Sequence, residues 1–167
     1  MNEAPSHSAA IHRSWRLAGD WKALDEVRRY LEFGRRFCHT ACREAAMMAS
    51  WELAENVIKY GLVDGDKVTG TMTIALWPGR TLIRTENKAN WAEGAHEVIS
   101  TITRLSTATS VRELYVQRMQ QLLTGEGKSY TRLGLLRVAY EGGFQLSYRH
   151  EAPRLEISAE RRCDSPA

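Results

Sequence analysis

Apolar and small residues recur at helical spacing near the start of the chain. Five of them follow one another at intervals of three or four positions: Leu24, Val27, Leu31, Gly34 and Cys38. This periodicity predicts an amphipathic helix that ends near Phe37. Asp20 precedes the helix, and its carboxylate is expected to accept hydrogen bonds from the free N–H groups of the first turn.

A second helical pattern covers residues 41–60. Its expected apolar stripe consists of Met47, Trp51, Ala54 and Ile58. Gly61 follows directly, and a glycine at this place is expected to end the helix in the left-handed conformation. The first third of the chain therefore predicts two consecutive helices.

A strand pattern then replaces the helical one. Residues 67–76 are rich in Thr, Val and Ile, Pro78-Gly79 is a turn signal, and residues 81–84 resume the strand pattern. Together they predict a β-hairpin. Residues 13–17 predict a short first strand.

The C-terminal half predicts helices followed by a second pair of strands. Helices are expected at about 91–105, 111–123 and 133–140, and strands at 144–148 and 154–158 with a turn at Pro153. Because adjacent strands are joined by short turns, the sheet should be mixed and mostly antiparallel, with helices packed on one face. The expected fold class is therefore α+β, a two-layer α/β sandwich.

Composition and charge narrow the class of protein. The 167 residues, 43% of them hydrophobic, suffice for one domain with its own core. We expect that domain at 11–160, with flexible termini at 1–10 and 161–167. The 23 basic and 20 acidic residues are interspersed, which argues against a nucleic-acid partner. No apolar run approaches the ~18 residues that cross a bilayer, so no membrane partner and a cytoplasmic location are expected.

Three cysteines, Cys38, Cys42 and Cys163, are expected to be reduced in such a protein. Cys38 and Cys42 are four residues apart and can share one helix face. We interpret them as two small core residues. The alternative, a zinc site, needs two more ligands, and no His or Cys pair at suitable spacing supplies them.

The segment with the clearest chemical pattern is 51–61. Glu52, Asn56 and Tyr60 recur every four residues and therefore lie along one side of the second predicted helix. The oxygen of an Asn carboxamide can complete a Mg²⁺ shell that otherwise consists of phosphates and water. A carboxylate one turn away can orient a hydroxyl nucleophile or accept its proton. The same spacing also occurs on many exposed helix faces, so the pattern alone does not decide the matter.

This segment resembles the N-box of the GHKL (histidine kinase-like, or Bergerat) ATPase superfamily, a helix with Glu, Asn four later, His or Tyr four later, and then Gly. Residues 82–89 are similar to the segment that carries the family's adenine-binding Asp and glycines. Residues 132–136 resemble the end of the glycine-rich ATP lid. The resemblance covers about residues 24–158, and it is closest to the SiaB-type serine kinases of bacterial partner-switching systems. Anti-sigma kinases are more distant relatives.

The resemblance implies a bacterial signalling protein that binds ATP and Mg²⁺ between the second helix and the lid. Glu52 would be the catalytic base for a serine hydroxyl, and Asn56 would be the metal ligand. The residues implied to contact the nucleotide are Asn56, Tyr60, Thr85, Asn87, Lys128, Arg132 and Gly134. The implied partner is a small protein that carries the phosphoacceptor serine, and a homodimer is compatible with the resemblance.

Two departures from the family pattern leave the activity open. Thr85 stands where the family has its adenine-binding Asp, and Asn87 occupies a glycine position. In the lid, Tyr130 and Arg132 stand where glycines normally lie; Lys128 and Arg132 can be phosphate ligands or part of a solvated loop. Two alternatives to a kinase therefore remain. One is a protein-interaction module that keeps the fold but has lost nucleotide binding, and the other is a helical regulator unrelated to GHKL proteins.

Overall fold

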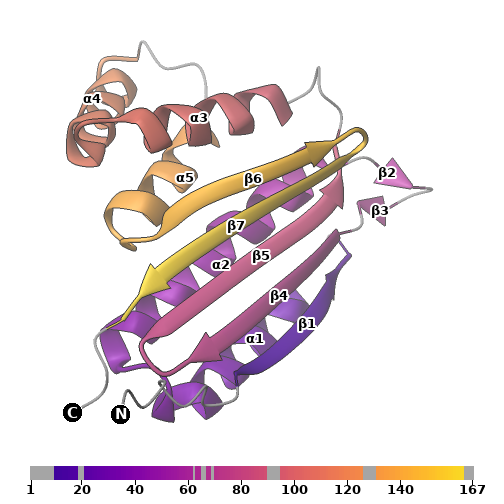
Figure 1. Cartoon of the computed structure of the whole chain (residues 1–167). Helices are drawn as coiled ribbons and strands as arrows, with labels where there is room; N and C mark the ends of the chain where they lie inside the picture. Colours follow the sequence, from indigo (N-terminus) through magenta and orange to yellow (C-terminus); the bar gives the residue numbers. More distant parts are fainter. Residues whose placement is uncertain are drawn as a thin grey trace, which may run out of the picture.

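The computed structural model describes residues 10–18, 21–61, 63–64, 67–68, 70–89, 95–125 and 131–163 (Figure 1). The strands in these ranges are β1 (Ile11–Leu17), β2 (Val63–Asp64), β3 (Lys67–Val68), β4 (Gly70–Trp77), β5 (Arg80–Lys88), β6 (Gln145–Glu151) and β7 (Arg154–Arg162). The helices are α1 (Lys22–Phe33), α2 (Thr40–Tyr60), α3 (His96–Thr107), α4 (Val111–Leu123) and α5 (Thr131–Tyr140), and a 3₁₀ turn follows α1 at Gly34–Arg36. The predicted hairpins and the three later helices are confirmed within these ranges.

Five strands form one open sheet in the order β1-β4-β5-β7-β6 (Figure 1). All four neighbouring pairs are antiparallel, so the expectation of a mixed sheet is wrong for the described part of the chain. The two hairpins, β4–β5 and β6–β7, meet with β5 antiparallel to β7, and β1 adds to the far edge of β4. This last pairing joins segments that are distant in the sequence, so no local sequence pattern predicts it.

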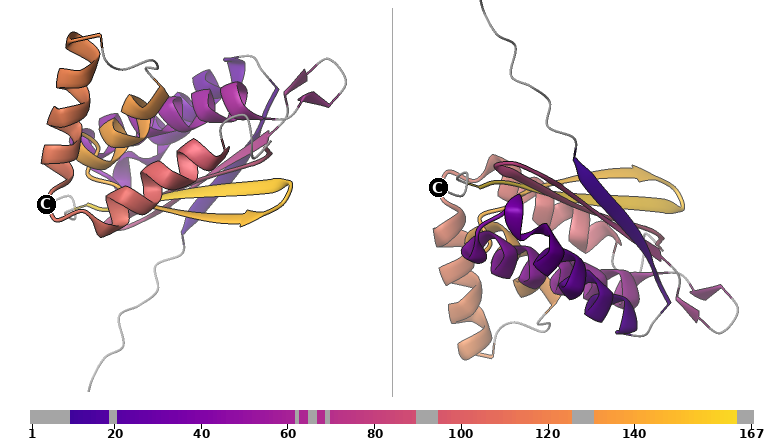
Figure 2. Two further views of the ribbon diagram at one scale, coloured as in Figure 1. Left: turned by 90° about the horizontal axis from the view of Figure 1, so that it is seen from above. Right: turned by 90° about the horizontal axis from the view of Figure 1, so that it is seen from below.

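The helices lie on one face of the sheet (Figure 2). α2 packs across β5 and β1, and α3 lies against β6. The opposite face is polar, and ion pairs between Arg80 and Glu160 and between Arg84 and Glu156 link β5 to β7 across it. One covered apolar face and one polar face make this an α+β fold with two layers in the described residues.

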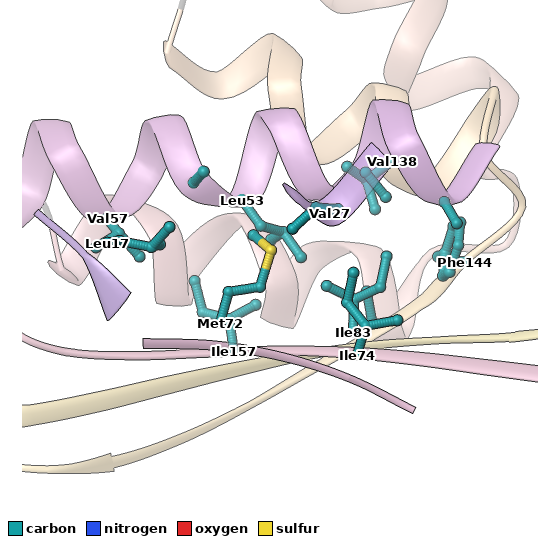
Figure 3. Close-up of a cluster of buried hydrophobic side chains, with 14 of the residues drawn as sticks. Leu17, Val27, Leu53, Val57, Met72, Ile74, Ile83, Val138, Phe144 and Ile157 are labelled. Carbon is teal, nitrogen blue, oxygen red and sulfur yellow. The ribbon is translucent and has the colours of Figure 1, made fainter. Parts of the chain in front are cut away.

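Helix α2 supplies the centre of the core (Figure 3). Its buried residues that face the sheet are Cys42, Ala46, Ala49, Leu53 and Val57. Of the expected stripe, Ala54 is buried in the core, but Trp51 is 45% exposed, and Met47 and Ile58 are only partly buried. Small side chains allow a helix to approach a sheet closely, and this is why the alanines rather than the larger Met and Trp face the strands.

Helix α1 buries the predicted stripe, since Leu24, Val27, Leu31, Gly34 and Cys38 are all buried. The α-helix itself ends at Phe33, a few residues before the expected end, and the 3₁₀ turn carries the stripe onward. The expected cap, Asp20, lies outside the described residues.

The ends of α2 and of the last strand differ from expectation. Gly61 is extended, with φ −68° and ψ 141°, rather than left-handed. It forms a bridge with Ala89, so the chain leaves α2 directly into strand-like pairing. β7 continues to Arg162, and Cys163 after it is buried. The ordered fold therefore passes the expected boundary at 160, because β7 pairs with β5 along its whole length.

Helix α4 stands apart from the rest of the helical layer. It spans the predicted residues and packs against α5, but none of its residues is buried. In Figure 2 it projects away from the sheet. Its contribution to the shared core is therefore small.

Candidate functional site

A small pocket lies between the C-terminal half of α2 and the first turns of α5. Its volume is about 160 Å³. The lining residues come from these two helices and are Glu52, Glu55, Asn56, Lys59, Leu133, Gly134 and Arg137. Three residues singled out in the sequence, Glu52, Asn56 and Gly134, are thus brought together although α5 begins more than 70 residues after α2 ends.

Glu52 is held at this pocket by an arginine from the opposite helix. Arg137 Nη1 donates to Glu52 Oε1 at 2.6 Å, and Arg137 Nε reaches Glu141 Oε2 at 3.3 Å. The Glu52 side chain is only 12% exposed. Burial raises the pKa of the Glu52 carboxyl, and the guanidinium of Arg137 opposes that rise. A carboxyl with a raised pKa and a fixed orientation is suited to proton transfer.

Gly134 permits the close approach of the two helices. A Cβ atom at this position would collide with Oε2 of Glu52 and would lie 3.3 Å from its Cδ. The sequence suggested Gly134 as a lid glycine that binds phosphate through its backbone. Its observed role is steric: the missing side chain leaves room for the Glu52 carboxylate.

Asn56 is buried beside Glu52, with 7% of its surface exposed. Its Nδ2 has no hydrogen-bond partner among the described residues, and the same is true of the Thr85 hydroxyl. A buried polar group without a partner costs about 1–3 kcal/mol. Such groups are rare in folded proteins, so these two atoms indicate where a ligand or water would bind.

The residues at the expected adenine position lie elsewhere. Thr85 and Asn87 are buried on the covered face of β5 and do not line the pocket between α2 and α5. Asn87 Nδ2 donates to the Lys88 carbonyl at 3.1 Å. The adenine-position residues are therefore not among those that line the pocket with Glu52 and Asn56.

The remaining predicted nucleotide ligands divide into two groups. Tyr60 is partly buried and packs against the hydrophobic core, which gives it a packing role. Arg132 lies in the first turn of α5, but its side chain is not described, and Lys128 lies outside the described residues.

Sequence reasoning missed the partner of Glu52. Arg137 follows Gly134 by three residues, so both lie on one face of α5. The spacing placed the two residues on one helix face, but only the tertiary structure shows that this face meets the Glu52 carboxylate. Lys59 and Glu55, which form an ion pair one turn apart on α2, complete the polar rim.

A second cluster of chemically active side chains lies at the other end of α2. The sulfur atoms of Cys38, Cys42 and Cys163 are all within 4.8 Å of one another, and all three residues are buried. Cys42 and Cys163 form a disulfide, with Cα atoms 6.3 Å apart, and Cys38 is free. The prediction that Cys38 and Cys42 are core residues is confirmed. The expectation that all three thiols are reduced is wrong for this pair, since the fold brings residue 163 to residue 42.

Comparison with known proteins gives no guidance on the class: no family model matches the chain, and no curated protein matches it. None of the helices that the structure describes has the length and apolar character needed to span a membrane. The site must therefore be interpreted from its own geometry.

The pocket fits one part of the implied ligand better than the other. Asn56 supplies a carboxamide oxygen, and Glu52 and Glu55 supply carboxylates, which are the donors that Mg²⁺ prefers. The adenine end fits less well, because Thr85 carries no charge and Asn87 bonds to its own backbone segment. The described pocket is also smaller than the ~300–1,000 Å³ typical of small-molecule sites.

Proposed function

We propose that this chain is a signalling protein of the GHKL ATPase type, similar to SiaB-type serine kinases. In this proposal it binds the phosphates of ATP with Mg²⁺ between α2 and α5 and phosphorylates a serine of a small partner protein. The observation that carries the proposal is the buried Asn56 side chain, whose Nδ2 has no partner among the described residues, one turn from the largely buried carboxyl of Glu52. Both side chains line a pocket against the first turns of α5, where the resemblance places the end of the lid.

Each residue would have a separate task. Asn56 would hold Mg²⁺ through its carboxamide oxygen, and the bound ion would neutralise charge on the phosphates. Glu52 would accept the proton of the serine hydroxyl. Its Oε1 accepts from Arg137, so Oε2, which lies against Gly134, would be the atom that receives this proton. Burial supports this role because it raises the pKa of the Glu52 carboxyl. The raised pKa is closer to the pKa of an effective base near neutral pH.

The second candidate is an interaction module that keeps the fold without turnover. Two observations favour it: the 2.6 Å ion pair between Glu52 and Arg137, and the absence of Thr85 and Asn87 from the residues that line the pocket. Loss of a charged hydrogen bond to adenine costs about 1.5–3 kcal/mol. This corresponds to about 10- to 150-fold in Kd, so weak ATP binding is expected even if the kinase reaction survives.

Calorimetric titration with ATP, with and without Mg²⁺, distinguishes the two candidates. We expect Mg²⁺-dependent binding in the high micromolar range that Asn56→Ala abolishes. The matched control is Gln145→Ala, which removes an exposed carboxamide from β6 and should leave binding unchanged. Absence of binding at millimolar ATP would leave the interaction module, whereas submicromolar binding would contradict the argument about the adenine site.

The role of Glu52 is tested separately with Glu52→Gln. The variant should suppress phosphorylation of a partner while sparing ATP affinity, because a base acts mainly in the transition state. An equal loss of ATP affinity would assign Glu52 to binding rather than to proton transfer.

A further inference from the structure

We propose that Cys38, Cys42 and Cys163, when reduced, form a binding site for one thiophilic metal ion, best fitted by Zn²⁺. This site is independent of the proposed kinase function. It lies around the first turn of α2, about 15 Å along the helix from Glu52 at 1.5 Å per residue. There Cys38 and Cys42, four residues apart, meet Cys163, which lies 121 residues further along the chain than Cys42, and each of the three is buried.

The positions of the sulfurs suit a metal ion. Three thiolates bound to Zn²⁺ at about 2.3 Å lie about 3.8 Å from one another in a tetrahedral site. The three cysteine sulfurs all lie within 4.8 Å of one another, so reduction of the disulfide has to separate Cys42 and Cys163 by only a small distance. Thiolates are also the ligands that favour Zn²⁺ and Cu⁺ over harder ions.

Thr81 caps the triangle of sulfurs. Its hydroxyl oxygen lies 3.8 Å from Cys42 Sγ, 3.9 Å from Cys38 Sγ and 3.8 Å from Cys163 Sγ. The oxygen is therefore nearly equidistant from all three, at the fourth corner of a tetrahedron. From there it can complete the coordination or donate a hydrogen bond to a thiolate, and outer-shell donors of this kind typically change metal affinity by about 10- to 100-fold.

Two of these four side chains belong to a helix or a strand, and Cys38 and Cys163 lie beside such elements. Cys42 is in the first turn of α2, Thr81 lies near the start of β5, and Cys163 directly follows β7. The Cys163 amide donates to the Gly79 carbonyl at 2.8 Å, which fixes the end of β7 beside the β4–β5 turn. Sites on such elements are more exactly positioned than sites on loops.

Positive charge next to the cluster favours thiolates. Arg43 donates to the Cys38 carbonyl at 2.9 Å, and Arg161 donates to the Gly142 carbonyl at 2.8 Å. Burial raises the pKa of the Cys38 thiol, and the Thr81 hydroxyl and the guanidinium groups of Arg43 and Arg161 oppose that rise. Three thiolates with one Zn²⁺ carry a net charge of −1, which these arginines offset.

The metal-binding form requires reduction first. A phosphine reductant breaks the Cys42–Cys163 bond: the two sulfurs gain two electrons and two protons, and the phosphine becomes its oxide with oxygen from water. The thiols then release protons to solvent as the metal binds. Disulfide formation and metal binding are thus mutually exclusive states of the same sulfurs.

The test uses the full chain, reduced by a phosphine under anaerobic conditions and then freed of reductant. Titration with Cd²⁺ should give thiolate-to-metal charge-transfer absorption that saturates at one ion per chain, and a separate titration with Zn²⁺ should give a Kd below 1 μM. Cys38→Ser should weaken binding at least 100-fold, although this variant keeps the pair that forms the disulfide. Thr81→Val should weaken binding about tenfold.

Two controls keep the result decisive. His12→Gln removes an exposed surface imidazole from β1 and should leave the affinity unchanged. The oxidised wild-type protein, which is folded and has only Cys38 free, should not bind the metal. The proposal is overturned if Cys38→Ser or the oxidised protein binds as tightly as reduced wild type, or if the Cd²⁺ complex lacks thiolate charge transfer.

Discussion

The two faces of α2 differ in how many of their contacts and hydrogen bonds other residues of the protein supply. The face toward the sheet carries Leu53 and Val57, which are completely enclosed by strand residues such as Met72 (Figure 3). The face toward α5 carries Glu52 and Asn56. Glu52 has a partner in Arg137, whereas the amide of Asn56 has none among the described residues.

This difference separates stability from function within one helix. Enclosed apolar residues contribute to folding in proportion to the surface that they bury. A buried amide without a partner works against folding, so its presence is better explained by a bound ligand than by the core. Substitutions on the two faces should therefore have effects of different size and sign.

The largest loss of stability is expected for Leu53→Ala. The residue is 0% exposed, and truncation of such a leucine costs about 2–5 kcal/mol because it removes buried surface and leaves a cavity. Urea unfolding measures the loss. Glu44→Ala, on the exposed side of the same helix, is the matched control and should change stability by less than ~0.5 kcal/mol.

Asn56→Ala should change stability much less, by about 1 kcal/mol or less. The lost packing is partly offset, because the variant no longer buries an amide without a partner. The same urea experiment measures this change. If Asn56→Ala and Leu53→Ala lowered stability equally, the two faces of α2 would be equivalent and Asn56 would be structural.

Glu52→Gln tests the electrostatics of the polar face through pH. Because the pKa of Glu52 is raised above its ordinary value of 4.5, the native protein holds this proton more tightly than the unfolded chain does. Stability from this group is therefore present at low pH and is lost as the pH rises through the raised pKa. Wild type should lose stability relative to Glu52→Gln over that window, as measured by unfolding at a series of pH values. A difference that stays constant with pH would show that the pKa is not raised.

The smallest net change in stability is expected for Gly134→Ala. The added methyl group would push the Glu52 carboxylate away, but Ala in a helix is favoured over Gly by about 1 kcal/mol. In a Glu52→Ala background the collision disappears, so Gly134→Ala should become stabilising. Thermal unfolding of the four proteins in this cycle measures the coupling, and equal effects in both backgrounds would contradict the packing role of Gly134.

Local periodicity explains why most elements were predictable. The range 111–123 was predicted for α4 and observed unchanged, and the α1 stripe from Leu24 to Cys38 is buried as expected. The stripe of α2 was right for Ala54 and wrong for Trp51, because size as well as apolarity decides which residues face a sheet. Ala46 and Ala49 permit close packing, whereas Trp51 stacks on Trp21 at the surface.

Contacts between distant segments limited prediction of the site. The sequence identified Glu52, Asn56 and Gly134, but nothing local links Glu52 to Arg137. The Cys42–Cys163 pair shows the same limit, with 121 residues between its members. Short spacing in the sequence brings together only Cys38 and Cys42, whereas the tertiary structure adds Cys163 to them.

Helix α4 has a consequence for the dynamics of the protein. Since none of its residues is buried, its detachment exposes little apolar surface, and its local opening free energy should be far below that of global unfolding. In native-state hydrogen exchange, the amides of α4 should exchange well before those of α2. Helix α4 packs on α5, and α5 carries Gly134 and Arg137 of the pocket. Detachment of α4 would therefore remove packing from the helix that lines the pocket, without disturbing the sheet.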